Sequence, residues 1–434
     1  MVEPVNAGFG RSGTLTALLA LGATAISGCG GGGGGAKAGA ATTRDSAGVK
    51  IVENAGPAWG SGQGWKVVDS PLVDVGSKGG EAVYELDQVR GPVRLSDGRL
   101  AIANAATSEV RLYDAAGKHV RSVGRSGSGP GEFQQIAGIW RGPGDSLWVS
   151  DLLVRRMTVL DSTAAVGRSY TLGAQGGQLL PTNGKVDFAI PTGVFADGSV
   201  VGVSQTFAIN QPRQGVYRDS MSVIRYGPDG VVRDTLGRFP GAEMEQITMT
   251  FGPQSVSAPT PVPLGKQTAV AVGKSRLFVV QNNAWEVEIR GLGGALQVLA
   301  RSPAKAASIT PSDVSAHRKE QLEAMEALPQ IRGMPEAIKK QFTARISEAK
   351  YPPTFPFFAS VLTDEDGNLW AQEAVSPTVK AQRYAVVDST GRWLGIVTMP
   401  AEFRATYIAS DAVYGVWKDD EGVEHLRGYP LRKG

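Results

Sequence analysis

The sequence is poor in the residue types that most often build catalytic and metal centres. It contains a single cysteine, Cys29, so an intramolecular disulfide framework is excluded. The three histidines, His119, His317 and His425, are far apart in sequence, which argues against a multi-histidine metal site. We find no Ser-His-Asp or Cys-His arrangement in a recognisable nucleophile context. The formal net charge is only +3, and the balanced composition gives no support for nucleic-acid binding.

The rest of the composition is that of a globular protein. Hydrophobic residues make up 42% of the chain and charged residues 20%. Glycine is abundant, with 57 residues, of which some form an N-terminal run and many others lie in predicted turns. We therefore expect a folded, turn-rich chain that is preceded by a low-complexity segment.

The N-terminus resembles a bacterial lipoprotein signal. Arg11 precedes an apolar stretch from Leu15 to Ile26, which is too short to span a bilayer, and Ile26-Ser27-Gly28-Cys29 resembles a lipobox. We predict a signal peptide over 1–28 and lipidation of Cys29; the alternative is a secretory signal with an incidental cysteine. Gly30 is not the aspartate of inner-membrane retention. We therefore expect a lipid-anchored protein of the cell envelope, at the outer membrane, facing the periplasm or the surface.

Residues 29–64 are rich in Gly, Ala and Ser and are predicted to be a flexible tether. From Trp65 onward, short strands alternate with turns. One recurring mark is a tight turn followed by an alternating strand, as in SDGRLAIAN (96–104), GDSLWVSD (144–151) and EDGNLWAQE (365–373). A second is a strand that ends in an Asp/Gly turn, as in VRLYDAAGK (110–118) and YAVVDSTGR (384–392). These marks define six units of four strands.

The repeat predicts the fold class. The units recur about every 45–50 residues, which is typical of a β-propeller. The prediction is an all-β, six-bladed β-propeller of four-stranded blades over 65–434, closed by an N-terminal strand that completes the last blade. Two insertions interrupt it. Residues 240–267 are Pro-, Ser- and Thr-rich and are expected to form a long loop. Residues 308–351 are expected to form a helical hairpin that begins at Thr310-Pro311.

The second unit carries a family resemblance. Gly129 to Phe133, then Leu147, Val149 and Asp151, and then Arg156 resemble the NHL-type repeat of six-bladed propellers and a family of secreted bacterial propeller lipoproteins. The resemblance implies a non-catalytic envelope protein or a propeller enzyme. The Gly-rich run precedes a strand and not a helix, so we interpret it as a connection between blades and not as a phosphate loop. Asp151 and Arg156 are expected to form a structural charge-assisted pair.

Candidate ligand-binding residues lie where the second strands of the repeats end. They are polar and, in a propeller, come round to one face: Asn104, Asp151, Gln281, Asn282 and Glu373. Carboxylate and amide oxygens suit Ca²⁺, and six-bladed lactonases resemble this arrangement, so calcium is the one cofactor the sequence suggests. The alternative is that these residues are solvated turn residues without a ligand.

Two functions follow from the sequence. The first is a monomeric, lipid-anchored, non-catalytic binding or scaffold propeller, attached to the membrane through Cys29. It would bind a small molecule, a glycan or a protein on the face that carries the two insertions, and would not bind nucleic acid. The second is a calcium-dependent, lactonase-like hydrolase with its site at the mouth of the central channel. The five strand-end residues would form that site only if they converge.

Overall fold

A computed structural model describes residues 39, 41–60, 62–173, 185–208, 213–251, 254–328, 331 and 333–434. The chain divides into two units, Met1–Lys37 and Ala38–Gly434, and the fold below is that of the second. The predicted signal peptide and Cys29 lie outside the described residues. Across the described residues, neither α-helix is long and apolar enough to cross a membrane.

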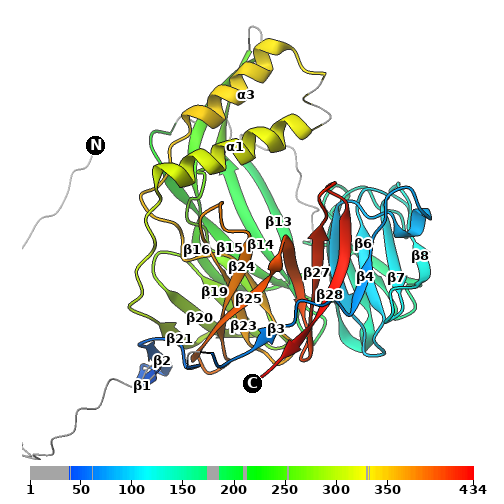
Figure 1. The fold of residues 1–434 in the computed structure, drawn as a ribbon, viewed down its shortest axis with the longest axis horizontal. Helices are drawn as coiled ribbons and strands as arrows, with labels where there is room; N and C mark the ends of the chain where they lie inside the picture. Colours follow the sequence, from blue (N-terminus) through cyan, green and yellow to red (C-terminus); the bar gives the residue numbers. More distant parts are fainter. Residues whose placement is uncertain are drawn as a thin grey trace, which may run out of the picture. The chain divides into compact units, whose positions relative to one another are not determined.

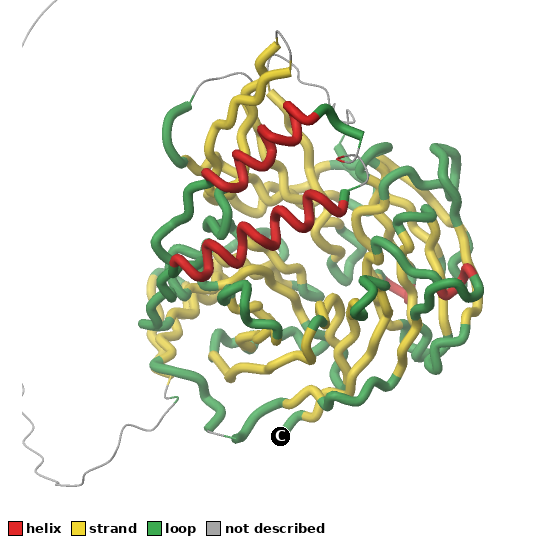
Figure 2. The backbone as a smooth tube through the Cα atoms, turned by 45° about the horizontal axis from the view of Figure 1, so that its top comes forward, coloured by secondary structure: helices red, strands yellow, loops and turns green. Residues whose placement is uncertain are grey.

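Six sheets form the blades (Figures 1 and 2). Blade 1 contains β5 (Val89–Arg94), β6 (Leu100–Asn104), β7 (Glu109–Tyr113) and β8 (His119–Val123). Blade 2 contains β9 (Ile136–Arg141), β10 (Leu147–Asp151), β11 (Arg156–Leu160) and β12 (Val166–Thr171). Blade 3 contains β13 (Lys185–Val194), β14 (Val200–Ala208), β15 (Tyr217–Tyr226), β16 (Val232–Phe251) and β17 (Gln254–Pro261).

The remaining three blades follow the same plan. Blade 4 contains β18 (Ala269–Val272), β19 (Arg276–Val280), β20 (Glu286–Gly291) and β21 (Leu296–Arg301), extended by β2 (Val49–Asn54) and β1 (Ala41–Ser46). Blade 5 contains β22 (Phe358–Thr363), β23 (Leu369–Glu373), β24 (Ala381–Val387) and β25 (Trp393–Ala401). Blade 6 contains β26 (Phe403–Ile408), β27 (Ala412–Lys418) and β28 (Glu424–Arg432), joined by β3 (Lys66–Val67) and β4 (Val73–Val75).

The first strand of each blade is its inner strand, and these six strands close a ring. β5 contacts β9, β9 contacts β13, and the series continues through β18, β22 and β26 back to β5. The predicted six-bladed propeller is therefore confirmed. The predicted closure is confirmed as well, because β28 pairs with β3 and β4 from the N-terminal side, and Figure 1 shows red β28 beside blue β4.

The outer turns explain why the repeat is visible in the sequence. In blade 5, the Asp388 carboxylate accepts hydrogen bonds from the backbone N–H groups of Thr390 and Arg392, which fixes the turn before the fourth strand. Gly391 ends that turn at φ 88°, in the left-handed region that glycine adopts at little cost. Asp114 makes equivalent backbone bonds in blade 1.

Hydrophobic cores lie between neighbouring blades. The core between blades 1 and 2 includes fully buried Phe133, from the Gly-rich connection, together with Leu112 and Val149. Glu132 accepts the backbone N–H of Gly129 at 2.8 Å. The interpretation of this stretch as a connection between blades is therefore confirmed.

The predicted flexible tether is wrong for its C-terminal part. β1 and β2 form a hairpin, β2 pairs in parallel with β21, and Val52 is buried in the core between blades 4 and 5. Residues 58 and 59 then hydrogen-bond to the backbone of β25. The valines and isoleucine of Val49–Val52 gain a buried surface that the Gly/Ala-rich composition around them concealed. The propeller thus begins at Ala41 and not at Trp65.

The predicted loop over 240–267 is also wrong. β16 continues to Phe251 and pairs with β17 in an antiparallel hairpin, from Met244–Pro261 to Phe251–Gln254. We call this hairpin, residues 244–261, the arm. Hydroxyl side chains face each other across it, as in Thr248–Ser257. Such cross-strand pairs stabilise a hairpin although the segment is rich in proline and serine.

The predicted helical insertion is confirmed. α1 (Pro311–Ala327) begins at an N-cap, where Thr310 and Asp313 form a reciprocal capping box, and α3 (Glu336–Glu348) follows it (Figure 2). Gln341 of α3 exchanges two hydrogen bonds, of 2.8 and 2.9 Å, with the backbone of Thr250 in the arm. Both insertions directly precede an inner strand, so they lie at the end of the propeller where the inner strands begin.

Candidate functional site

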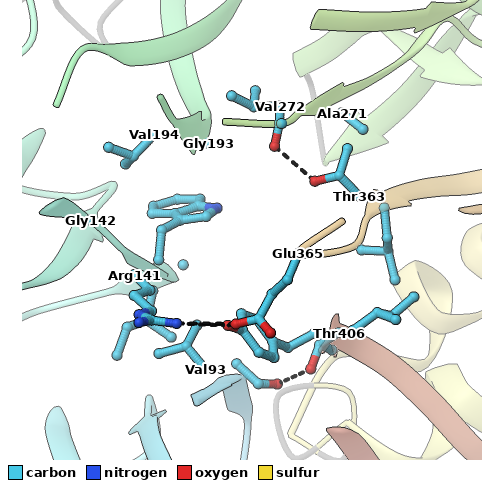
Figure 3. A pocket seen from close by; sticks show the side chains of 18 of the residues that line it. Val93, Arg141, Gly142, Gly193, Val194, Ala271, Val272, Thr363, Glu365 and Thr406 are labelled. Carbon is cyan, nitrogen blue, oxygen red and sulfur yellow. Dashed lines mark hydrogen bonds and ion pairs between the residues drawn. The ribbon is translucent and has the colours of Figure 1, made fainter. Parts of the chain in front are cut away.

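A cavity lies on the axis of the propeller. It has a volume of about 1040 Å³ and is lined by segments of all six inner strands and the turns that follow them (Figure 3). We call the end where the inner strands begin, near Arg90 and Arg404, the insertion end. We call the opposite end, near Arg94, Arg141 and Glu365, the turn end.

An ion-pair network crosses the channel at the turn end. Arg141 Nη1 of blade 2 lies 3.1 Å from Glu365 Oε1 of blade 5, on the opposite side of the ring (Figure 3). Arg94 of blade 1 lies 2.7 Å from Asp411 and 3.6 Å from Glu365. The Tyr407 hydroxyl donates to Glu365 at 2.6 Å. Glu365 therefore links four blades.

A second carboxylate completes this network. Asp145 lies 2.5 Å from Arg141 Nε and also accepts a hydrogen bond from the backbone N–H of Ser96 at 3.0 Å. Burial acts to raise the pKa of the Asp145 carboxyl, but the hydrogen bonds from Ser96 and Arg141 outweigh burial and lower it. The hydrogen bond from Arg94 likewise lowers the pKa of Asp411.

The pKa values of Arg94 and Tyr407 are raised, whereas those of the two aspartates are lowered. Burial opposes the charged form of Arg94, but its hydrogen bonds to Asp411 and Tyr414 outweigh burial and raise its pKa. Burial raises the pKa of Tyr407, and its hydrogen bond to Glu365 adds to this effect. At neutral pH, Arg94, Asp145 and Asp411 are therefore charged and Tyr407 is neutral.

The insertion end has a different charge pattern. Arg90 and Arg404 both line the cavity, and in the described part of the chain neither forms an ion pair with a carboxylate. Arg90 makes two long contacts of 3.4 Å to the backbone carbonyls of Gln88 and Val89. Among the described residues, no carboxylate forms an ion pair with either arginine at this end.

Apolar residues form part of the wall between the two ends. Val93, Ile139, Val270 and Val361 line it, together with the half-buried indole of Trp140. Threonine hydroxyls here join neighbouring blades and do not face a ligand: Thr406 donates to the Gly91 carbonyl at 2.6 Å and Thr363 to the Val272 carbonyl at 2.9 Å (Figure 3). The channel thus has apolar residues along part of its wall and, at one end, two arginines without an ion-pair partner among the described residues.

Two of the five predicted ligand-binding residues, Asn104 and Asn282, form hydrogen bonds within the fold. Asn104 is buried; its Oδ1 accepts the Asp87 N–H at 2.8 Å and its Nδ2 donates to Thr107. Asn282, also buried, forms two hydrogen bonds of 2.9 Å with the backbone of Phe358 and so joins blade 4 to blade 5. These amides stabilise the junctions of the blades.

The predicted pair of Asp151 and Arg156 is wrong, although the two residues lie opposite each other in the register of β10 and β11. Asp151 accepts four backbone N–H bonds instead, the shortest from Gln134 at 2.6 Å. Arg156 donates to the backbone carbonyls of Ser128 and Glu132. Both side chains satisfy backbone groups of the Gly-rich connection, which would otherwise be costly to bury.

Gln281 and Glu373 lie in separate surroundings. Gln281 donates to Glu288 at 2.8 Å. Glu373 pairs with Arg383 at 3.2 Å and lines a second cavity of about 510 Å³ between the arm, α1 and blade 5. Burial raises the pKa of Glu373, although Arg383 opposes the shift. Asp151 lines a third, small cavity of about 180 Å³, so Asp151 and Glu373 do not share a site.

The residues of the channel were missed by sequence reasoning. In the described residues, no group of three or more His, Cys, Asp or Glu side chains is arranged to hold a metal ion. The channel residues belong to the inner strands and to the turns after them, whereas the prediction looked at the ends of the second strands. The available signal was an arginine near the start or end of an inner strand, as at Arg90, Arg94, Arg141 and Arg404.

Comparison with known proteins agrees with this fold. Residues 86–152, which span blade 1 and the beginning of blade 2, match a family model described as a 6-bladed beta-propeller. The chain is a six-bladed β-propeller. No curated protein matches its sequence.

Similar solved structures share little sequence with this propeller. A DUF4221 family member from Bacteroides vulgatus has 10% identity over 86% of this chain and 99% of its own, with a TM-score of 0.48. The calcium-binding protein regucalcin from Agrobacterium tumefaciens has 9% identity over 84% and 95%, with a TM-score of 0.37. Virginiamycin B lyase from Staphylococcus aureus has 10% identity over 84% and 88%, with a TM-score of 0.35.

Proposed function

We propose that this propeller binds a small molecule in its central channel. The observation that supports this proposal is the cavity of about 1040 Å³, which is lined by all six blades and crossed at one end by the Arg141–Glu365 ion pair. Pockets that bind small molecules are commonly apolar clefts of this size with a few polar groups. The arm and the two helices precede the inner strands β18 and β22, and none of their described residues lines the cavity.

We propose binding and not calcium-dependent hydrolysis because of what the predicted ligand atoms do. The oxygens of Asn104, Asp151 and Asn282 each accept backbone hydrogen bonds within the fold. A calcium ion would have to compete with these bonds for the same oxygens. The groups of the channel that a ligand could contact lie along its wall and at its insertion end.

A thermal-shift screen of a metabolite library tests the proposal. A ligand that binds only the folded state raises the melting temperature. The matched variant is Ala137→Trp, because half-buried Ala137 lines the cavity and a larger side chain there occupies its volume. We expect compounds that stabilise the wild type to lose their effect on Ala137→Trp. Equal shifts in both proteins would place the binding site outside the channel.

We also propose that the propeller is tethered to the outer membrane through a lipid on Cys29. The lipobox-like sequence and Gly30 support this proposal. The first strand begins at Ala41, so the linker of about 11 residues reaches at most roughly 40 Å. Cys29→Ser should release the protein from the membrane fraction into the soluble fraction. A Cys29→Ser protein that stays with the membranes would refute the anchor.

A further inference from the structure

We propose that the channel ligand is an amphipathic anion. Its carboxylate or phosphate group is held by Arg90 and Arg404 at the insertion end, and its apolar body lies along the channel wall. This proposal rests on the proposed function of the channel and names the chemical class of the ligand.

Arg90 and Arg404 both line the cavity at the insertion end. Arg90 lies in β5 and Arg404 in β26, the inner strands of blades 1 and 6, which are neighbours in the ring. The hydrogen bond of 2.6 Å from Thr406 to the Gly91 carbonyl ties these two strands together next to both arginines. Arg90 and Arg404 thus lie on neighbouring inner strands and line the same cavity. A pair of planar, five-donor groups is well suited to an oxyanion.

The described carboxylates that line the cavity all bind groups other than Arg90 and Arg404. The acidic residues that line the cavity are Asp145, Asp364 and Glu365. Asp145 and Glu365 are held by Arg141 at the turn end. Asp364 is buried and accepts hydrogen bonds from the side chains of Asn368 and Trp370. No carboxylate of the cavity, in the described residues, remains to neutralise Arg90 and Arg404, and a bound anion would do so.

The cavity also offers apolar residues to the body of the ligand. Beyond the two arginines, the wall is formed by Val93, Ile139, Val270 and Val361, with Trp140 as its large aromatic surface. The indole of Trp140 lies over Gly138, where a β-carbon would approach it to 2.4 Å, so the glycine makes room for the ring. Burial of an apolar or aromatic ligand body against this wall is favourable.

Three probes that share one body and differ in the head group test this inference: phenylbutyrate, phenylbutanol and phenylbutylamine. The protein is labelled with fluorotryptophan, and the fluorine signal of Trp140 is assigned by its loss in Trp140→Phe. The probes are titrated at millimolar concentration while this signal is followed by NMR. We expect phenylbutyrate to shift the Trp140 signal and to bind about tenfold or more tightly than the other two.

The charge requirement is tested by the double variant Arg90→Gln/Arg404→Gln. We expect it to lose this preference, with phenylbutyrate about tenfold weaker. The matched control is Arg392→Gln/Arg432→Gln, which removes the same charge from two exposed arginines outside the cavity and should retain the preference. A melting temperature close to that of the wild type shows that each variant is folded.

Two results would overturn the inference, and they differ in what they say about the channel. If all three probes shift the Trp140 signal with equal affinity, or if the preference survives in Arg90→Gln/Arg404→Gln, the channel binds ligands but does not select anions. If no probe moves the Trp140 signal, the amphipathic anion is rejected. The proposed function is then decided by the library screen with Ala137→Trp alone.

Discussion

The two ends of the channel carry the same residue type in opposite electrostatic settings. At the turn end, Arg94 and Arg141 are each within 3.1 Å of a carboxylate. At the insertion end, Arg90 lies four residues before Arg94 in the same strand and has no carboxylate partner within the described residues. Arg94 and Arg141 join blades through carboxylates, whereas we propose that Arg90 and Arg404 bind the ligand.

The largest expected effect comes from breaking the turn end. Glu365→Gln removes the carboxylate that contacts Arg94, Arg141 and Tyr407, while Asp411 and Asp145 still pair with the two arginines. A hydrogen bond to a charged group contributes about 1.5–3 kcal/mol, so the loss of these contacts should cost about 2–3 kcal/mol. Urea unfolding measures the change in the free energy of unfolding.

The control for this variant is Glu421→Gln. Glu421 pairs with Lys78 at 2.8 Å, but both side chains are about two-thirds exposed, at 67% and 70%. Solvent screens such an exposed pair, so Glu421→Gln should change the free energy of unfolding much less than Glu365→Gln. Equal losses in Glu365→Gln and Glu421→Gln would mean that the turn-end network does not stabilise the ring.

A smaller effect is expected in the acid range. The pKa values of Asp145 and Asp411 are lowered below 3.8 in the folded state. Their stabilisation is therefore complete above about pH 4 and is lost as the pH falls through the folded-state pKa values. Asp145→Asn should lower stability by about 1–2 kcal/mol at neutral pH and should flatten the acid limb of the profile. If the stability of Asp145→Asn falls at acid pH as steeply as that of the wild type, the Asp145 carboxylate does not contribute to the pH dependence of stability.

The smallest effect on stability is expected at the insertion end. Arg90→Gln/Arg404→Gln removes no ion pair, so the free energy of unfolding should change by less than about 0.5 kcal/mol. The acid limb of the profile should match the wild type, since the titrating carboxylates lie at the other end. A loss as large as that of Glu365→Gln would make these arginines structural and would remove the contrast between the two ends.

The sequence was sufficient for the fold because the signal is local and repeated. The turn before the outer strand is held by an aspartate that accepts two backbone hydrogen bonds in several blades, as at Asp114, Asp161 and Asp388, so period and strand number could be predicted. The hairpin of β1 and β2 was missed because only a few residues, including Val52, find a buried place, and that place lies on β21, far along the chain. The arm was missed because proline and serine usually indicate a loop.

The candidate site could be predicted much less well, for a physical reason. Polar residues at strand ends, such as Asn104 and Asp151, look alike in sequence whether they bind a ligand or cap backbone groups. Their role depends on which backbone N–H groups the segment before the inner strand brings near. In the same way, the difference between Arg90 and Arg94 depends on Glu365 and Asp411, which come from blades 5 and 6. Such long-range partners are set by ring closure and not by local pattern.

The most direct test of the account is a charge reversal at the insertion end. The affinities of phenylbutyrate and phenylbutylamine are measured for the wild type and for Arg90→Glu/Arg404→Glu, with the Trp140 fluorine signal as the reporter in both. The account predicts that the wild type prefers the carboxylate and that the variant prefers the amine. An unchanged preference after charge reversal would contradict it, because the head group would then be selected by another part of the molecule.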